Sequence, residues 1–132
     1  MLELPTFLSP LEKAVIDLII NGLPSACAEL RIQLNGSRLE SREHNGYGFY
    51  TTFAIPEDAP AAALPNAQLA ASALVDDQLG GFLLWIRDGK VDFLEGYPLG
   101  GDAWPSNEQP LTGDAWPENE DIRELRLNKN SC

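Results

Sequence analysis

Acidic side chains that are brought close together can hold a divalent cation or exchange protons with a substrate. The carboxylates that a fold can bring to one sheet edge are Asp76, Asp77, Asp92 and Glu95, with Asp102 and Asp114 nearby. Asp92, however, alternates with Val91 and Phe93, as a solvent-facing strand residue does. The acids after residue 100 lack the spacing of an EF-hand. We therefore expect a solvated acidic surface rather than a catalytic or metal site.

Other kinds of chemistry have even less support. His44 is the only histidine, which excludes a zinc site built from several imidazoles. Cys27 and Cys132 are the only thiols, and neither lies in a C-x-x-C pair or beside a base. The paired glycines do not open a phosphate-binding loop. We expect no cofactor, no metal and no catalytic residues, which favours a protein that is not an enzyme and leaves the alternative of a small enzyme open.

A tandem duplication is the most conspicuous sequence feature. Pro98–Gln109 reads PLGGDAWPSNEQ and Pro110–Asp121 reads PLTGDAWPENED. Two copies of 12 residues are too few and too short for a solenoid, so we interpret residues 98–121 as a duplicated loop, here called the repeat segment. Aromatic residues in an exposed acidic loop are typical anchors for a protein partner. The predicted partner-binding residues are Tyr97, Asp102, Trp104, Asp114 and Trp116.

The repeat segment leaves two other interpretations open. One Trp can fold back over the sheet edge while the second copy is a tolerated insertion. Alternatively, each loop can reach into a second copy of the chain, so the oligomeric state stays open.

A second functional hypothesis places a pocket between helices and sheet. Its predicted ligand-binding residues are Tyr50, Trp85, Glu95 and Tyr97, with Glu95 polarising an aromatic lining. This would make the chain a small enzyme or a ligand-binding protein. A deep aromatic cavity with converging carboxylates would favour this alternative, and a filled core would count against it.

The net charge of the chain limits the kinds of molecule that it can bind. The 132 residues carry a formal charge of −11, of which residues 1–54 contribute −2 and residues 55–132 contribute −9. Repulsion then excludes nucleic acid and anionic membranes and favours a basic protein partner. The first ten residues lack a basic n-region, and Ala14–Ile20 is too short to cross a bilayer. We expect a single domain over 1–132 in the cytoplasm.

Two helices are expected near the N-terminus. Ser9 and Glu12 form a Ser-x-x-Glu capping box around Pro10, and Gly22 ends the helix that follows. A second helix is expected over Ser25–Asn35, although its Leu30, Ile32 and Leu34 also fit a strand.

After Gly36 the apolar period changes to two, which indicates strands. The expected strands are Ser37–His44, Tyr47–Ile55, Gln68–Asp76 (alternatively a short helix), Gly81–Ile86, Val91–Glu95 and a closing edge strand at Ile122–Asn128. Asn45-Gly46 and Asp88-Gly89 are expected hairpin turns. The predicted fold class is α+β, with two N-terminal helices packed on one antiparallel sheet of four to five strands.

The order of these motifs resembles a family of small bacterial proteins of unknown function. The matching motifs are GFYTxFxIP at residues 48–56, GFLLWIxDG at 81–89, LEGY at 94–97 and WP at 104–105. The resemblance implies a compact α+β domain and no catalytic residues. Some small acidic bacterial domains of this kind are immunity proteins that neutralise toxins, which is an analogy of class.

Overall fold

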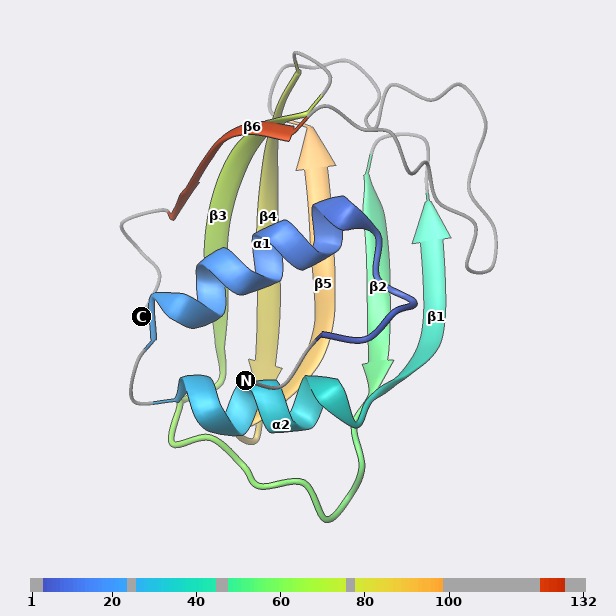
Figure 1. Cartoon of the computed structure of the whole chain (residues 1–132), viewed down its shortest axis with the longest axis vertical. Coiled ribbons are helices and arrows are strands. Elements are labelled where there is room, and N and C mark those ends of the chain that lie inside the picture. Colours follow the sequence, from blue (N-terminus) through green and yellow to red (C-terminus); the bar gives the residue numbers. More distant parts are fainter. Residues whose placement is uncertain (1–3, 24–25, 45–47, 76–77, 99–121, 128–132) are drawn as a thin grey trace.

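The computed structural model describes residues 4–23, 26–44, 48–75, 78–98 and 122–127. Within these residues, two helices precede six strands: α1 (Pro10–Asn21), α2 (Cys27–Asn35), β1 (Arg38–His44), β2 (Phe49–Ala54), β3 (Ala67–Val75), β4 (Gln78–Arg87), β5 (Lys90–Pro98) and β6 (Ile122–Leu127). The strands form one antiparallel sheet in the order β1-β2-β5-β4-β3-β6. Both helices cover the same face of this sheet (Figure 1).

The predicted α+β class, with N-terminal helices packed on an antiparallel sheet, is confirmed. The described sheet has six strands rather than four to five, because β6 adds at the edge beside β3 while Ala67–Val75 is a strand and not a helix. The single domain over 1–132 stays a prediction. None of the described helices has the length and apolar run that crossing a bilayer requires.

The first helix begins as its capping box predicts. The Ser9 hydroxyl accepts a hydrogen bond from the Glu12 N–H at 3.0 Å, and the Glu12 carboxylate accepts one from the Ser9 N–H at 2.8 Å. Pro10 occupies the first turn, and Gly22 caps the C-terminus. The apolar stripe of α1 then packs on the sheet, which buries Val15, Ile16, Ile19 and Ile20 among other residues.

Successive side chains of each strand point to opposite faces of the sheet. Along β2, Phe49, Thr51 and Phe53 are buried under the helices, and the residues between them are half-buried on the other side. The neighbouring strands add the buried side chains Leu69, Ala71, Phe82, Leu84 and Leu94. One apolar core therefore lies between one sheet face and the two helices, and neither of these two helices covers the opposite face.

The β4–β5 hairpin closes through the predicted turn. Arg87 pairs with Lys90, so Asp88 and Gly89 are the two turn residues, with φ of 53° and 75°. Positive φ at both positions is the pattern of a type I′ turn, which matches the twist of antiparallel strands. The Asn45-Gly46 turn lies outside the described residues.

A buried ion pair ties the first helix to the sheet. Glu12 on α1 and Arg42 on β1 meet at 2.7 Å, and neither side chain is exposed. The second Glu12 oxygen accepts a hydrogen bond from the Thr51 hydroxyl on β2. Arg42 also donates to the Phe7 carbonyl at 3.1 Å. One carboxylate thus joins the helix N-terminus, β1 and β2.

A buried glutamine fixes the second helix over the place where two strands separate. The register of β2 with β5 ends at Thr52 opposite Phe93. Beyond this point the Gln33 side chain on α2 accepts a hydrogen bond from the Val91 N–H at 2.9 Å. Its amide group donates to the carbonyls of Gly89 and Pro60, each at 2.8 Å. Gln33 therefore hydrogen-bonds to backbone groups that lie beyond the paired residues of β2 and β5.

Replacing Glu12 by Gln should lower the free energy of unfolding by about 3–5 kcal/mol, because Arg42 would keep its charge in a buried site without a counter-charge. Urea unfolding measures the change. The matched control is Asp92→Asn, which breaks the exposed Arg87–Asp92 pair (3.6 Å) and should cost less than about 1 kcal/mol. Equal losses for the two variants would contradict this account of the buried pair.

Gln33→Met should lower the free energy of unfolding by about 1–3 kcal/mol, because the buried Val91 N–H would lose its partner while the Gly89 carbonyl keeps the Ala62 N–H. The exposed Ile32→Met on the same helix is the control and should be neutral. Hydrogen exchange of the Val91 amide gives a local readout. A Gln33→Met variant whose Val91 amide stays as protected as in the parent chain would show that other groups hold it.

Candidate functional site

The sheet face opposite the two described helices, here called the open face, carries aromatic and apolar side chains. They come from three adjacent strands in the order β2, β5 and β4: Tyr50 and Thr52; Phe93, Glu95 and Tyr97; Leu79, Leu83 and Trp85. Most are half-buried, and Leu79 is 46% exposed. A face of this composition, with large rings and few charges, resembles the centre of a protein interface more than an ordinary solvated surface.

Glu95 lies at the centre of the open face and holds two of these rings. Its Oε1 accepts a hydrogen bond from the Trp85 indole N–H at 3.1 Å, and its Oε2 accepts one from the Tyr50 hydroxyl at 3.3 Å. Phe93 stacks on Trp85 with centroids 5.2 Å apart and meets Tyr50 edge to face at 6.0 Å. These four residues, here called the Glu95 cluster, are fixed by hydrogen bonds and ring contacts across three strands.

The negative charge of Glu95 acts on Tyr50. The nearby Glu95 carboxylate raises the pKa of the Tyr50 hydroxyl, and burial, the hydrogen bond to Glu95 and the charge of Glu43 act in the same direction. Each of these effects disfavours the tyrosinate. Tyr50 is therefore a neutral hydrogen-bond donor at physiological pH, and it is not a candidate general base.

Tyr97 shares the open face with the Glu95 cluster. It stands opposite Gly81, and a Cβ at residue 81 would lie 2.5 Å from the Tyr97 ring. Glycine is thus required for the ring to lie flat across β4. Tyr97 is two residues beyond Glu95 on β5, so both point to the same side of the sheet.

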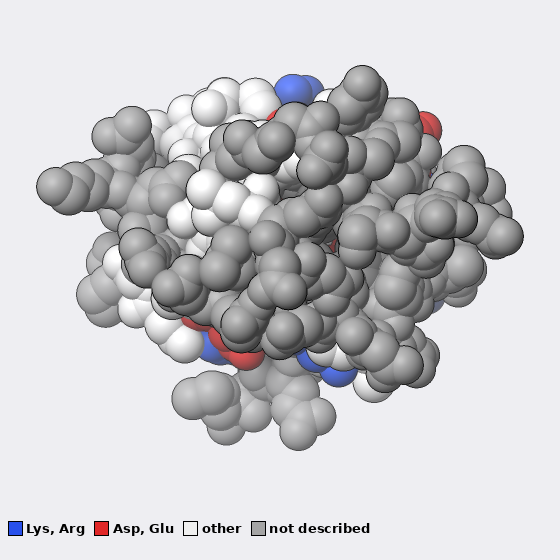
Figure 2. All heavy atoms as spheres, turned by 90° about the horizontal axis from the view of Figure 1, so that it is seen from above, with Lys and Arg blue, Asp and Glu red and all other residues white. Residues whose placement is uncertain are grey.

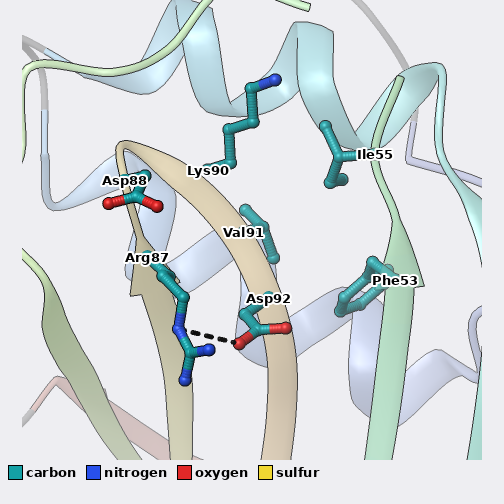
Figure 3. A pocket seen from close by; sticks show the side chains of 7 residues that line it. All are labelled: Phe53, Ile55, Arg87, Asp88, Lys90, Val91 and Asp92. Carbon is teal, nitrogen blue, oxygen red and sulfur yellow. Dashed lines mark ion pairs between the residues drawn. The ribbon is translucent and has the colours of Figure 1, made fainter. Parts of the chain in front are cut away.

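A hollow opens where β2 and β5 separate, beyond the end of their register at Thr52 and Phe93 (Figure 3). It has a volume of about 480 Å³ and is lined by Phe53, Ile55, Arg87, Asp88, Lys90, Val91 and Asp92. In Figure 3, Phe53 and Ile55 come from one side and Val91 from the other, with the Arg87–Asp92 ion pair at the rim. The hollow therefore has an apolar floor and a rim with charges of both signs.

The structure brings together all four residues predicted for the ligand site, but in a different place. Tyr50, Trp85 and Glu95 are in direct contact, and Tyr97 lies beside them on the same face. The predicted location of the pocket, between helices and sheet, was wrong, because the apolar core fills that space. Period-two alternation puts Tyr50 on the opposite side from its buried neighbours Phe49 and Thr51.

Among the described residues, the carboxylates that were considered for one sheet edge do not meet there. Asp92 and Glu95 lie on β5, which is an inner strand, and they contact different partners, Arg87 and the Tyr50–Trp85 pair. Asp76, Asp77, Asp102, Trp104, Asp114 and Trp116 lie outside the described residues. In the part of the chain that the structure describes, no three His, Cys, Asp or Glu side chains are grouped as metal ligands.

Figure 2 views the molecule from above and shows several of the described charged side chains. The visible Lys, Arg, Asp and Glu side chains lie around the margin of that view and are of both signs. By sequence, residues 99–121 contain six acids and no Lys or Arg. Much of the acidic excess of the second half therefore belongs to the repeat segment.

Sequence reasoning missed the buried polar residues that position the open face. Arg42, Gln33 and Thr51 are all buried and contact groups far away in the chain. The sequence pattern could have indicated the role of Thr51. This polar residue lies on the inward side of β2 between Phe49 and Phe53, so its hydroxyl needs a buried hydrogen-bond partner.

A comparison with protein-family models, with curated proteins and with solved structures found no match to this chain. The resemblance to small bacterial proteins therefore stays a prediction, and the functional argument depends on the geometry of the site.

Glu95→Gln should lower the pKa of Tyr50 towards the ordinary tyrosine value of about 10, because the charge that disfavours tyrosinate is removed. A raised folded-state pKa contributes stability that is present below the ordinary value and is lost as pH rises through the raised value. The variant should lose less stability on going to alkaline pH. Ultraviolet titration of tyrosinate, with Tyr50→Phe to identify the group, measures the shift. Glu57→Gln is the control, and an equal shift there would contradict the assignment.

Proposed function

We propose that this chain is a non-enzymatic interaction domain that binds a basic protein partner through the open face. An inhibitor or immunity role is the most concrete form of this function. The observation that carries the proposal is the Glu95 cluster: a carboxylate set among three aromatic rings on the sheet face that neither described helix covers.

The composition of the open face supports a protein partner. Trp and Tyr contribute most to binding when they lie at the centre of an interface and are surrounded by residues that exclude water. Trp85 and Tyr50 would take that central position, with Leu83 close to them on β4 and the exposed Leu79 farther along the same strand. The hollow lined by Phe53 and Val91 offers an apolar floor for one side chain of the partner.

Net charge supports a basic partner. A formal charge of −11 would steer a basic protein towards the chain and speed the encounter at low salt. Asp102, Trp104, Asp114 and Trp116 of the repeat segment remain part of the proposal as acidic and aromatic contacts, with Tyr97 at the point where β5 leads into that segment.

A small-molecule ligand is the second candidate. It is favoured by the hollow of about 480 Å³, which falls within the size range of ligand pockets. The charged residues at its rim, Arg87, Lys90 and Asp92, would then orient the ligand.

Two exposed apolar residues allow a matched test of the open face. Leu79 on β4 is 46% exposed and Ile32 on α2 is 43% exposed, and they lie on opposite sides of the molecule. Leu79→Lys should reduce capture of a basic partner from extracts of the native cells at least about ten-fold, through repulsion and lost apolar contact. Ile32→Lys should leave capture unchanged.

Quantitative mass spectrometry of captured proteins at low and high salt provides the readout. A supporting partner is basic and is released by salt. The double variant Trp104→Ala with Trp116→Ala tests the contribution of the repeat segment. If Leu79→Lys and Ile32→Lys retain the same proteins in the same amounts, the open face is not the interface.

A further inference from the structure

Glu95 is a carboxylate whose orientation is set by neutral donors. The Trp85 indole and the Tyr50 hydroxyl each serve one of its oxygens. Among the described residues, the ion pairs join Arg31 to Asp17, Arg42 to Glu12 and Arg87 to Asp92, and Glu95 takes part in none of these. A carboxylate offers about four lone-pair positions, so each Glu95 oxygen keeps an acceptor position after these two bonds.

The charges around Glu95 do not neutralise it. Its ladder neighbours are Tyr50 on β2 and Leu83 on β4, and Phe93 and Tyr97 flank it along β5 on the same face. Glu43 lies opposite Tyr50 on β1 and carries a second negative charge. This charge contributes to the raised pKa of the Tyr50 hydroxyl. A cation that reaches this part of the open face therefore meets two acids and several rings.

We infer that the Glu95 cluster binds the guanidinium group of an arginine side chain of the partner. This inference depends on the proposed function, because it names the chemical group that the open face recognises. The remaining acceptor positions on the two oxygens match the parallel N–H groups of a guanidinium, which binds carboxylates in a two-pronged manner. The rings of Tyr50, Trp85 and Phe93 provide π-faces for the planar cation.

Arginine fits this site better than lysine for two physical reasons. Guanidinium is flat and weakly hydrated, so it can stack on a ring and leave water at little cost. An ammonium group is a compact, strongly hydrated point charge, and it lacks the pair of parallel N–H groups that bind both oxygens of a carboxylate. The site selects for the shape of the cation as well as for its charge.

The test is a titration of the full chain with N-acetyl-arginine amide, followed by NMR. The indole N–H of Trp85, assigned by its loss in Trp85→Phe, reports directly on the hydrogen bond to Glu95. N-acetyl-lysine amide and N-acetyl-alanine amide are titrated at the same ionic strength. We expect a saturable shift with the arginine probe, with a Kd in the millimolar range, and at least ten-fold weaker binding of the lysine probe.

Two variants and one control complete the design. Glu95→Gln keeps the shape of the side chain and should weaken arginine binding at least about ten-fold. Tyr50→Phe keeps the ring and removes one donor to Glu95, so a loss of about three-fold is expected even if Glu95→Gln folds poorly. Glu57→Gln removes an equal charge from an exposed loop position and should bind like the parent chain.

Three results would overturn the inference: no saturable shift, equal shifts with all three probes, or unchanged arginine binding in Glu95→Gln. A Trp85 signal that moves with protein concentration and not with the probe would also overturn it, because a second copy of the chain would then occupy the face. If the probe fails while Leu79→Lys still abolishes partner capture, the guanidinium site is wrong and the proposed function stands. If the probe binds and capture is unaffected by Leu79→Lys, the proposed function fails and the guanidinium site stands.

Discussion

The buried carboxylate of Glu12 is the constraint on which the rest of the structure depends. It caps the first turn of α1 through the Ser9 N–H, pairs with Arg42 on β1 and accepts from Thr51 on β2. A charge in an unexposed site is tolerated only when all its partners are present. The helix can therefore dock at one position along one face of the sheet. Because neighbouring strand residues point to opposite sides, the choice of Thr51 for the helix side assigns Tyr50 to the open face.

The second helix extends the same dependence to the other end of the sheet. Gln33 hydrogen-bonds to the β4–β5 turn and to Val91, which satisfies backbone groups where β2 and β5 have separated. A sheet that opens in this way would otherwise expose unpaired N–H and C=O groups to the core. The hollow lined by Phe53 and Val91 lies at this separation. The position of α2 and the opening of the sheet are thus linked through Gln33 and Val91.

Local signals in the sequence predicted local structure well. The Ser9–Glu12 capping box, the Asp88-Gly89 turn and the alternation along β2 each involve residues a few positions apart, and each was confirmed. The contacts that position the site span much longer separations: 39 residues for Glu12 with Thr51 and 58 for Gln33 with Val91. The inward direction of Arg42 also follows an irregularity between Leu39 and Ser41, which shifts the register of β1 by one residue. Period-two reasoning has no means of placing such a shift.

Glu95 can act both as the acceptor that orders two rings and as the acid that receives a cation. Its two oxygens each accept one hydrogen bond, from the Tyr50 hydroxyl and from the Trp85 indole, whereas a Gln at this position would present one acceptor and one donor. A carboxylate is therefore suited to holding both rings at once. One acceptor position remains on each oxygen, and a cation that uses these positions would be attracted more strongly in a partly dehydrated site than in water. Receiving a cation is thus compatible with holding the two rings in place, because the same two hydrogen bonds orient the carboxylate for it.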